Sequence, residues 1–254
     1  MSPKYLRLSG RTALITGSTG GLGVALADAL AAEGAFVIVS GRDKSRGDTV
    51  VAGIRSAGGE AAFVSADLSA GEDELRRVAA MATEAAGGRI DILVNNAATL
   101  LMPTPTAEIS GQTLSDVFAV NVFAPFLLTG ALAPAMAARG NGAIVNVGSI
   151  TGLHGAAGSA VYNGTKATLH SFTKSWADEY GPLGVRVNAV APGPIATERA
   201  AQFADHNAPT LARLPSRRMS TPEEVAASVV FLASDDASNI HGAVLSVDGG
   251  WAAI

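Results

Sequence analysis

The sequence predicts an α/β protein built on one doubly wound parallel sheet of about seven strands, with helices on both faces. Three observations support this fold class. Short apolar runs alternate with longer helix-like stretches along most of the 254 residues. The first run leads directly into a glycine-rich turn and a helix. Several later runs end in polar or turn-forming residues, at the positions where parallel strands present ligand-binding loops.

The first strand and helix carry a nucleotide-binding pattern. Residues 11–16 form a short apolar run, residues 17–23 read Gly-Ser-Thr-Gly-Gly-Leu-Gly, and residues 24–34 are strong helix formers closed by a glycine. A strand, a glycine turn and a helix in this order are the context of a dinucleotide fingerprint, because the backbone can approach a pyrophosphate and the helix N-terminus offers free N–H groups. Taken alone, the turn also fits an ordinary glycine-rich connection.

The remaining elements follow in regular alternation. Apolar runs predict further strands over residues 35–40, 61–66, 91–94, 143–148, 185–190 and 243–247. Helices are expected over residues 45–57, 73–86, 114–138 and 159–180. Helices that join successive strands produce a parallel sheet covered on both faces. Because no linker, repeat or low-complexity tract interrupts this pattern, residues 1–254 are expected to form a single domain.

Composition excludes several functions. The net charge of −4 and the absence of cysteine argue against nucleic-acid binding, disulfides and thiol catalysis. The four histidines are scattered without metal-ligand spacing, so no metal site is expected. Residues 117–138 are uncharged and long enough to span a membrane. They contain Asn121 and two prolines, which favours a core helix or a subunit interface. We therefore expect a cytoplasmic protein without a membrane span.

Tyr162 and Lys166 are candidates for a general acid–base site. On a helix, residues four apart share one face, and a nearby ammonium lowers the phenol pKa from its usual value of about 10. Ser149 follows the strand over residues 143–148, where its hydroxyl could meet a substrate oxygen that Tyr162 protonates or deprotonates. Such a pair also occurs by chance on many helices. The nucleotide-binding pattern in the same domain favours the catalytic interpretation.

With these residues assembled, the chain closely resembles the short-chain dehydrogenases/reductases from about Leu8 to Trp251. The matching motifs are Thr16-Gly17-x-x-x-Gly21-x-Gly23, Asp67, Asn95-Asn96-Ala97, Asn121, Ser149, Tyr162-x-x-x-Lys166, Pro192-Gly193 with Thr197, and Val247-Asp248-Gly249-Gly250. Their combination in this order is highly specific, although no single motif is. The resemblance implies a Rossmann-type fold and an oxidoreductase that uses a nicotinamide cofactor.

The resemblance also implies residue roles. Tyr162 would be the catalytic acid/base, and Lys166 would lower its pKa and bind the nicotinamide ribose. Ser149 would orient the substrate oxygen, and Asn121 would help hold a water that links Lys166 to solvent; alternatively, Asn121 only kinks a buried helix. The expected cofactor contacts are Gly17, Ser18, Thr19, Gly21, Leu22, Gly23, Arg42, Asp67, Leu68, Asn95, Ala97, Tyr162, Lys166, Pro192, Gly193, Ile195 and Thr197.

Three positions depart from the family pattern. Ala98 stands where the family usually has a glycine, which could reshape the floor beside the nicotinamide. Thr165 replaces the usual serine before the lysine and keeps the hydroxyl, so little effect is expected. His154 lies in the segment after Ser149 and is expected to be a loop residue rather than a second acid/base.

Cofactor preference depends on the end of the second strand. The position where relatives carry an acidic residue that selects NAD falls on Gly41, and Arg42 follows. A guanidinium can pair with a 2′-phosphate through two hydrogen bonds, so we expect NADP(H) to be preferred, with NAD(H) possible. The alternative is a solvated Arg42 with dual or NAD use, particularly because Asp43 could neutralise it.

The predicted function is hydride transfer between a nicotinamide cofactor and a carbonyl or secondary alcohol of a small molecule. A 3-oxoacyl-thioester reductase and a sugar or polyol dehydrogenase both fit this description. Other classes are a non-catalytic NAD(P)-binding regulatory protein and a structural oligomer subunit, which the four catalytic candidates argue against. Residues 194–218 are expected to form a substrate lid. The apolar stretch over residues 117–138 predicts a homotetramer, or otherwise a homodimer.

Overall fold

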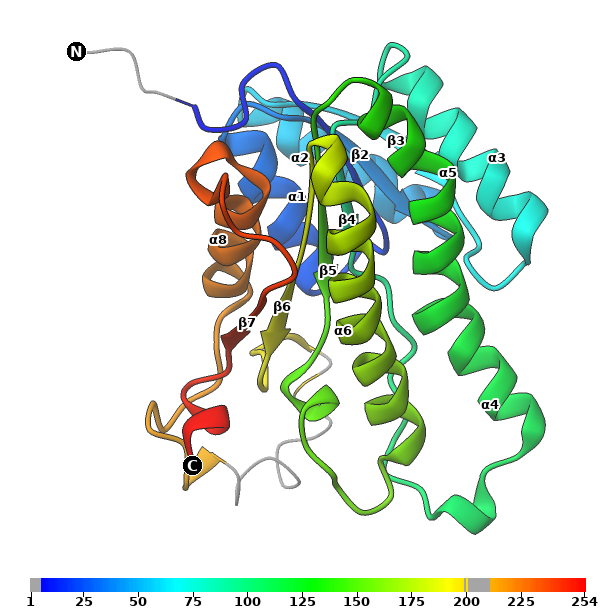
Figure 1. Cartoon of the computed structure of the whole chain (residues 1–254), viewed down its shortest axis with the longest axis vertical. Helices are drawn as coiled ribbons and strands as arrows, with labels where there is room; N and C mark the ends of the chain where they lie inside the picture. The colour runs from blue at the N-terminus through cyan, green and yellow to red at the C-terminus, as the bar shows by residue number, and fades with distance from the viewer. Residues whose placement is uncertain (1–5, 199, 201–210) are drawn as a thin grey trace.

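A computed structural model describes residues 6–198, 200 and 211–254 (Figure 1). Seven strands form one parallel sheet in the order β3-β2-β1-β4-β5-β6-β7, which confirms the predicted fold class. The strands are β1 (Thr12–Ile15), β2 (Phe36–Gly41), β3 (Glu60–Ser65), β4 (Ile92–Asn95), β5 (Gly142–Val147), β6 (Val185–Pro192) and β7 (Val244–Val247). From β1 to β3 the chain adds strands toward one edge of the sheet, and from β4 to β7 it adds them toward the other edge. A crevice opens at such a switch point, here between β1 and β4.

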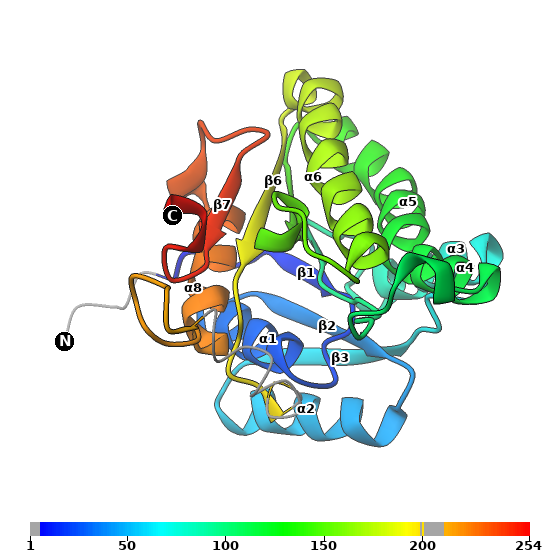
Figure 2. The ribbon, with the colours of Figure 1, turned by 90° about the horizontal axis from the view of Figure 1, so that it is seen from below.

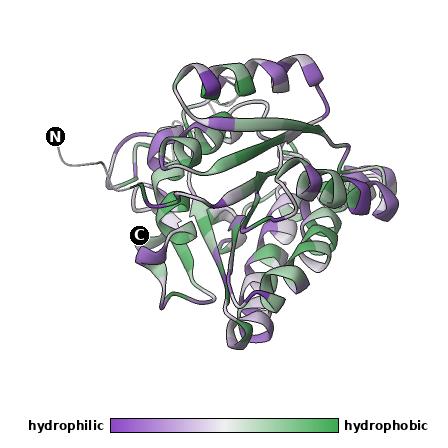
Figure 3. Ribbon diagram, turned by 90° about the horizontal axis from the view of Figure 1, so that it is seen from above, coloured by the Kyte–Doolittle hydropathy of each residue, from purple (hydrophilic) through white to green (hydrophobic). Residues whose placement is uncertain are grey.

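Helices cover both faces of the sheet. The α-helices are α1 (Leu22–Ala32), α2 (Lys44–Ser56), α3 (Glu72–Ala85), α4 (Gly111–Phe118), α5 (Ala124–Ala138), α6 (Ala160–Tyr180) and α8 (Pro222–Ala233). Figure 2 shows α1, α2 and α8 on one side of the strands and α3, α5 and α6 on the other. Hydrophilic residues gather mainly on the outward surfaces of these helices (Figure 3).

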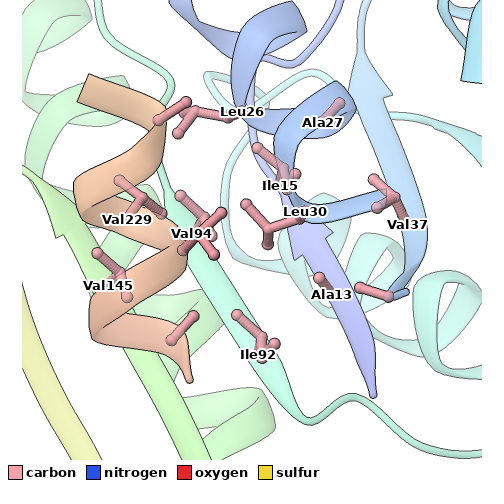
Figure 4. Close-up of a cluster of buried hydrophobic side chains, with 14 of the residues drawn as sticks. Ala13, Ile15, Leu26, Ala27, Leu30, Val37, Ile92, Val94, Val145 and Val229 are labelled. Carbon is pink, nitrogen blue, oxygen red and sulfur yellow. The ribbon is translucent and has the colours of Figure 1, made fainter. Parts of the chain in front are cut away.

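The two cores follow from alternation along the strands. Ile15 contacts the cluster formed with α1, α2 and α8, and its neighbour Leu14 belongs to the cluster formed with α3, α5 and α6. In the first cluster, Leu26 and Leu30 of α1 lie against the sheet beside Val229 of α8 (Figure 4). All of these side chains are fully buried. Their burial contributes about 1.5–3 kcal/mol for each large aliphatic side chain, and it fixes the strand ends that carry the polar residues.

Helix α8 is the element that the sequence prediction lacked. It begins with a capping box, in which the Thr221 hydroxyl accepts from the Glu224 N–H and the Glu224 carboxylate accepts from the Thr221 N–H. Pro222 occupies the first turn, where its missing N–H does no harm. These start signals are visible in the sequence, and they could have identified the helix.

The predicted helix over residues 114–138 is interrupted. A π-helical turn over Ala119–Phe123 separates α4 from α5 and holds Asn121. By length and composition Gly111–Ala138 could cross a membrane, and it is the one such helix among the described residues. Half of its most apolar window is buried within the protein, and the core helix of a soluble protein passes the same test. Phe123 and Phe126 on its outer side are 54% and 51% exposed.

Candidate active site

One cleft of about 1180 Å³ runs along the carboxyl ends of the strands. The glycine turn after β1 and the segments that follow β2, β3, β4, β5 and β6 all line it. Most of the predicted site residues are therefore brought together. The predicted lid over residues 194–218 lies partly outside the described residues. Its described beginning, residues 194–198 and 200, lines the cleft.

The glycine turn fits the pyrophosphate of a dinucleotide. A Cβ atom on Gly23 would lie 2.2 Å from the Gly17 carbonyl oxygen, so α1 packs against the turn at a distance that only glycine permits. By contrast, Gly20 has no atom within 4 Å of its Cβ position and faces the cleft. No side chain caps the N-terminus of α1, and its first turn has no acidic residue. The Gly23 and Val24 N–H groups donate to the Gly20 and Gly21 carbonyls at 3.1 and 3.3 Å, and the positive end of the helix dipole favours an anion here.

The other end of the turn meets two arginines. Arg42 and Arg46 line the cleft beside Thr19 and Gly41. Asp43, which the sequence suggested as a partner that could neutralise Arg42, instead caps α2 by accepting from the Arg46 N–H at 3.1 Å. Arg46 was absent from the sequence prediction. Its position four residues after Arg42, in the first turn of the helix that follows β2, is the signal that could have found it.

Asp67 closes the same end of the cleft. Its carboxylate accepts from the Ser69 hydroxyl at 2.6 Å and from the Ser69 N–H at 3.0 Å. These bonds, with a smaller contribution from the positive charge of Arg42, lower the pKa of Asp67 below its usual value. Asp67 is therefore an anionic acceptor at neutral pH, suited to an amino group or a hydroxyl.

Ser149, Tyr162 and Lys166 line the cleft together. The Lys166 ammonium donates to the Val147 carbonyl at 2.8 Å and lies 5.7 Å from the centre of the Tyr162 ring. Burial lowers the pKa of Lys166 to about 8. The Ser149 hydroxyl lies 2.9 Å from the Thr151 hydroxyl, where either group can donate, and it accepts from the Thr151 N–H at 3.2 Å; when the Thr151 hydroxyl donates, the Ser149 hydrogen is available to a substrate. The three groups provide a proton donor, a phenol and a cation in one place.

Asn121 does not line the cleft; its buried side chain fixes the walls. The Asn121 amide oxygen accepts from the Thr99 N–H at 2.7 Å, and its nitrogen donates to the Thr99 carbonyl and the Thr165 hydroxyl, each at 3.1 Å. Thr165 in turn donates to the Tyr162 carbonyl at 2.7 Å. The π-helical turn is thereby tied to the Tyr162 helix, a role for the Thr165 hydroxyl that the sequence did not reveal.

Two other predicted contacts also point away from the cleft. The Ser18 hydroxyl donates to the Ile15 carbonyl and accepts from the Ser40 N–H, each at 2.8 Å. The Asn95 amide donates to Asn146 on the adjacent strand at 2.9 Å. Both side chains are turned into the protein and hold neighbouring segments together. Asn96 lines the cleft in place of Asn95, because successive residues of an extended chain face opposite sides.

The part of the cleft next to Ser149 and Tyr162 is mainly apolar. Among the described residues that line this part are Leu100, Leu101, Pro103, Val120, Ile150, Thr151, Ser159, Asn163 and Trp251. The Thr104 N–H donates to the Gly158 carbonyl at 2.7 Å and joins two of the loops that form its walls. His154 is exposed and does not line the cleft, so it lies on a loop as expected.

The fold, the glycine turn and the Ser149, Tyr162 and Lys166 cluster together define a nicotinamide-dependent oxidoreductase of the Rossmann type. The family model described as enoyl-(acyl carrier protein) reductase matches residues 17–252. The chain belongs to the short-chain dehydrogenase/reductase family.

Relatives with assigned activities are dehydrogenases and reductases of alcohols and ketones. The chain is 39% identical over 252 residues to a cyclopentanol dehydrogenase from Comamonas testosteroni, covering 97% of this chain and 99% of that protein. It is 40% identical over 248 residues to a cis-4-hydroxycyclohexanecarboxylate dehydrogenase from Sinomonas cyclohexanicum, covering 96% and 97%. The protein is accordingly an oxidoreductase that transfers a hydride between a nicotinamide cofactor and a carbonyl or alcohol.

A solved structure gives the same result. A protein from Beutenbergia cavernae, assigned as an NAD(P)-dependent gluconate 5-dehydrogenase and holding NADP at low occupancy, is 39% identical with a TM-score of 0.91. The match covers 98% of this chain and 100% of that one. It supports a nicotinamide cofactor in the cleft described above.

Proposed function

We propose that this protein is an NADP(H)-preferring dehydrogenase of small, neutral cyclic secondary alcohols, with Tyr162 as the acid/base. The observation that carries the proposal is the distribution of charge along the cleft. Arg42 and Arg46 lie at the adenosine end, whereas Lys166 is the one cation among the described lining residues near Ser149. Such a cleft favours an anionic cofactor tail and an uncharged substrate.

The arginines support NADP(H) over NAD(H). Gly41 lacks the carboxylate that would bind a ribose 2′-hydroxyl and repel a 2′-phosphate. Asp43 accepts from the Arg46 N–H at 3.1 Å and also pairs with the Arg46 guanidinium at 3.6 Å, whereas Arg42 forms no ion pair among the described residues. The guanidinium of Arg42, and that of Arg46 beyond its contact with Asp43, provide donors for a phosphate.

The substrate class rests on the other end of the cleft. A sugar acid or a carrier-bound thioester would bring carboxylate or phosphate groups that need cationic partners. The described lining near Ser149 offers Lys166, which would be occupied by the cofactor ribose, and Glu198, which repels anions. Hydroxyl and amide groups on Thr151, Ser159 and Asn163 sit among apolar side chains, an environment that suits a neutral ring alcohol such as cyclopentanol, for which one of the two relatives is named.

In the proposed mechanism, the chain manages the proton. Ser149 donates a hydrogen bond to the substrate oxygen and holds it next to the Tyr162 hydroxyl. During oxidation Tyr162, as phenolate, accepts the alcohol proton, and the Lys166 charge stabilises that phenolate. During reduction the same phenol donates the proton to the oxygen. The nicotinamide, when bound, accepts or supplies the hydride. Asn121 would support this site in two ways. Its side chain anchors the wall of the cleft, and its main-chain carbonyl would accept a hydrogen bond from a water that links Lys166 to solvent.

The test is a substrate and cofactor panel followed by the absorbance of the reduced nicotinamide. Cyclopentanol, cyclohexanol, gluconate and a 3-oxoacyl thioester are each offered with both cofactors. We expect the highest kcat/KM for a cyclic alcohol with NADP. A higher kcat/KM for gluconate or the thioester would contradict the substrate class, and tenfold preference for NAD would contradict the cofactor assignment. Absence of turnover with saturating cofactor bound would favour the regulatory alternative.

We also propose a homotetramer, or otherwise a homodimer, located in the cytoplasm. Phe126 packs against Phe172 and Trp176 of α6, with ring centres 5.4 and 6.0 Å apart, yet half of its surface is exposed. Phe123 lies exposed on the same helical segment. An aromatic surface across α5 and α6 is typical of a contact between subunits.

A further inference from the structure

A buried histidine lies directly behind Ser149. His170 belongs to α6, one helical turn beyond Lys166, and is 4% exposed. It does not line the cleft, so it cannot touch a substrate there. The family motif did not include it, and the scattered histidines gave no reason to select it from the sequence. Its place is nevertheless specific, because its ring lies between the Lys166 helix and the turn that carries Ser149.

The Ser149 turn is shaped around this ring. The Ser149 N–H donates to the His170 Nε2 at 3.4 Å. A Cβ atom on Gly148 would lie 2.0 Å from that Nε2, and a Cβ atom on Gly152 would lie 2.9 Å from the ring Cε1. Glycines on both sides of Ser149 therefore allow the backbone to close on the imidazole. Any larger residue at either position would displace the ring or the turn.

The hydrogen bond also fixes the form of the imidazole. Because Nε2 accepts, the ring proton must lie on Nδ1 in the neutral form. Nδ1 is buried and has no hydrogen-bond partner among the described residues. Burial, together with the charges of Lys166 and Lys174, lowers the pKa of His170 to about 4. His170 thus remains a neutral acceptor for the Ser149 N–H at physiological pH.

We propose that His170 is a positioning residue for Ser149. The imidazole holds the Ser149 main chain from behind, so that the hydroxyl stays directed at the substrate oxygen beside Tyr162. This inference rests on the proposed role of Ser149 in orienting the substrate. The competing explanation is that His170 only fills space in the core. A space-filling role requires volume, whereas a positioning role requires the acceptor and must act through the Ser149 side chain.

A double-mutant cycle separates the two roles. His170→Leu fills the space without an acceptor, and we expect it to lower kcat about 10-fold or more in the wild-type background, because transition-state contacts of the serine are lost. In a Ser149→Ala background, measured at high enzyme concentration, the same change should lower kcat less than about 2-fold. Equal fold-losses in the two backgrounds would overturn the inference. Full activity of Ser149→Ala alone would instead contradict the proposed function.

Two further variants guard against a folding artefact. His170→Gln places an amide oxygen near the position of Nε2 and should recover at least about a third of the kcat that His170→Leu loses. The matched control is Thr173→Val, on the same helix as His170. It removes the buried hydrogen bond that the Thr173 hydroxyl accepts from the Asn146 amide at 2.9 Å. It should lower the thermal midpoint without lowering kcat more than about 2-fold. If His170→Leu fails to fold, His170→Gln is compared with Thr173→Val instead. A kcat that falls more than about 3-fold in His170→Gln, while Thr173→Val keeps its kcat, opposes the inference.

Hydrogen exchange provides a readout that is independent of turnover. In the cofactor-free protein, the peptide that contains Ser149 should exchange its amides faster in His170→Leu, and at the wild-type rate in His170→Gln and Thr173→Val. Unchanged exchange in His170→Leu would show that the imidazole does not hold the Ser149 N–H and would overturn the inference.

Discussion

A Cβ atom on Gly41 would lie 2.7 Å from the hydroxyl oxygen of Thr19. The glycine turn and the end of β2 therefore approach each other so closely that an acidic side chain at position 41 does not fit beside Thr19. Arg42 and Arg46 line the cleft next to this contact. We therefore expect cofactor preference to depend on positions 19 and 41 together rather than on one residue.

A cofactor switch should require both positions. We expect Gly41→Asp alone to weaken both cofactors, because the new side chain collides with Thr19. With Thr19→Ala, which removes the two nearest atoms, Gly41→Asp should prefer NAD at least about tenfold. Gly41→Asn provides nearly the same bulk without charge as the control. Ratios of kcat/KM for the two cofactors measure the effect, and an efficient NAD enzyme from Gly41→Asp alone would contradict the steric argument.

Arg42→Ala and Arg46→Ala should each lower kcat/KM for NADP about 10- to 100-fold, because a charge-assisted hydrogen bond contributes about 1.5–3 kcal/mol. The value for NAD should change less than about 3-fold in both variants, since NAD has no 2′-phosphate. Lys44→Ala is the control, because Lys44 pairs with Asp48 at 2.6 Å and does not line the cleft. An equal loss of kcat/KM with both cofactors would show that the substitutions disturb the fold and that the arginines do not bind the 2′-phosphate.

Tyr162→Phe should lower kcat by about 10²–10⁴-fold, the usual contribution of general acid–base catalysis. Cofactor affinity, measured by fluorescence titration, should stay close to wild type, because the phenol acts on the proton. Retention of more than a tenth of wild-type kcat would remove Tyr162 from the mechanism.

Lys166 should make stability depend on alkaline pH. Its pKa is about 8 in the folded protein and returns to the ordinary lysine value of 10.5 on unfolding. The unfolded state therefore binds more protons between these values, and stability rises with pH across this window. Relative to Lys166→Met, the wild type should gain up to about 3 kcal/mol in the free energy of unfolding from about pH 7 to about pH 10. Parallel pH profiles from denaturant titrations would contradict this.

Phe126→Lys should produce a smaller assembly. A charge on the aromatic surface of α5 and α6 opposes burial between subunits, since desolvating an unpaired ammonium is unfavourable. Met81→Lys on α3 is the control, because Met81 is exposed to a similar extent, at 42%, on a helix outside this surface. Sedimentation at micromolar concentration should show a loss of mass for Phe126→Lys alone, and a monomeric wild type would remove the proposal.

The sequence predicts the fold well, because strand and helix periodicities are local properties. The strand ends that it places in the site also meet in one cleft. The sequence does not reveal which of two neighbouring residues at the end of a strand faces the cleft. Asn95 and Asn96 have the same side chain, yet they point in different directions. The π-helical turn breaks the helical period over only Ala119–Phe123, which a hydrophobic pattern does not resolve. His170 required tertiary structure, because the partner of its ring is a backbone group 21 residues away.

The π-helical turn also constrains the length of the chain. It accommodates one residue more than a regular helical turn would, and each residue of a helix advances the side chains by about 100° around the axis. Deleting one residue within Ala119–Phe123 would therefore rotate the faces of α4 and α5 relative to each other. Asn121 could then not reach Thr99 and Thr165 while Phe126 kept its place against Trp176. Insertions and deletions in this segment would thus damage the catalytic wall and the exposed aromatic face together, so this stretch should tolerate substitutions far better than changes in length.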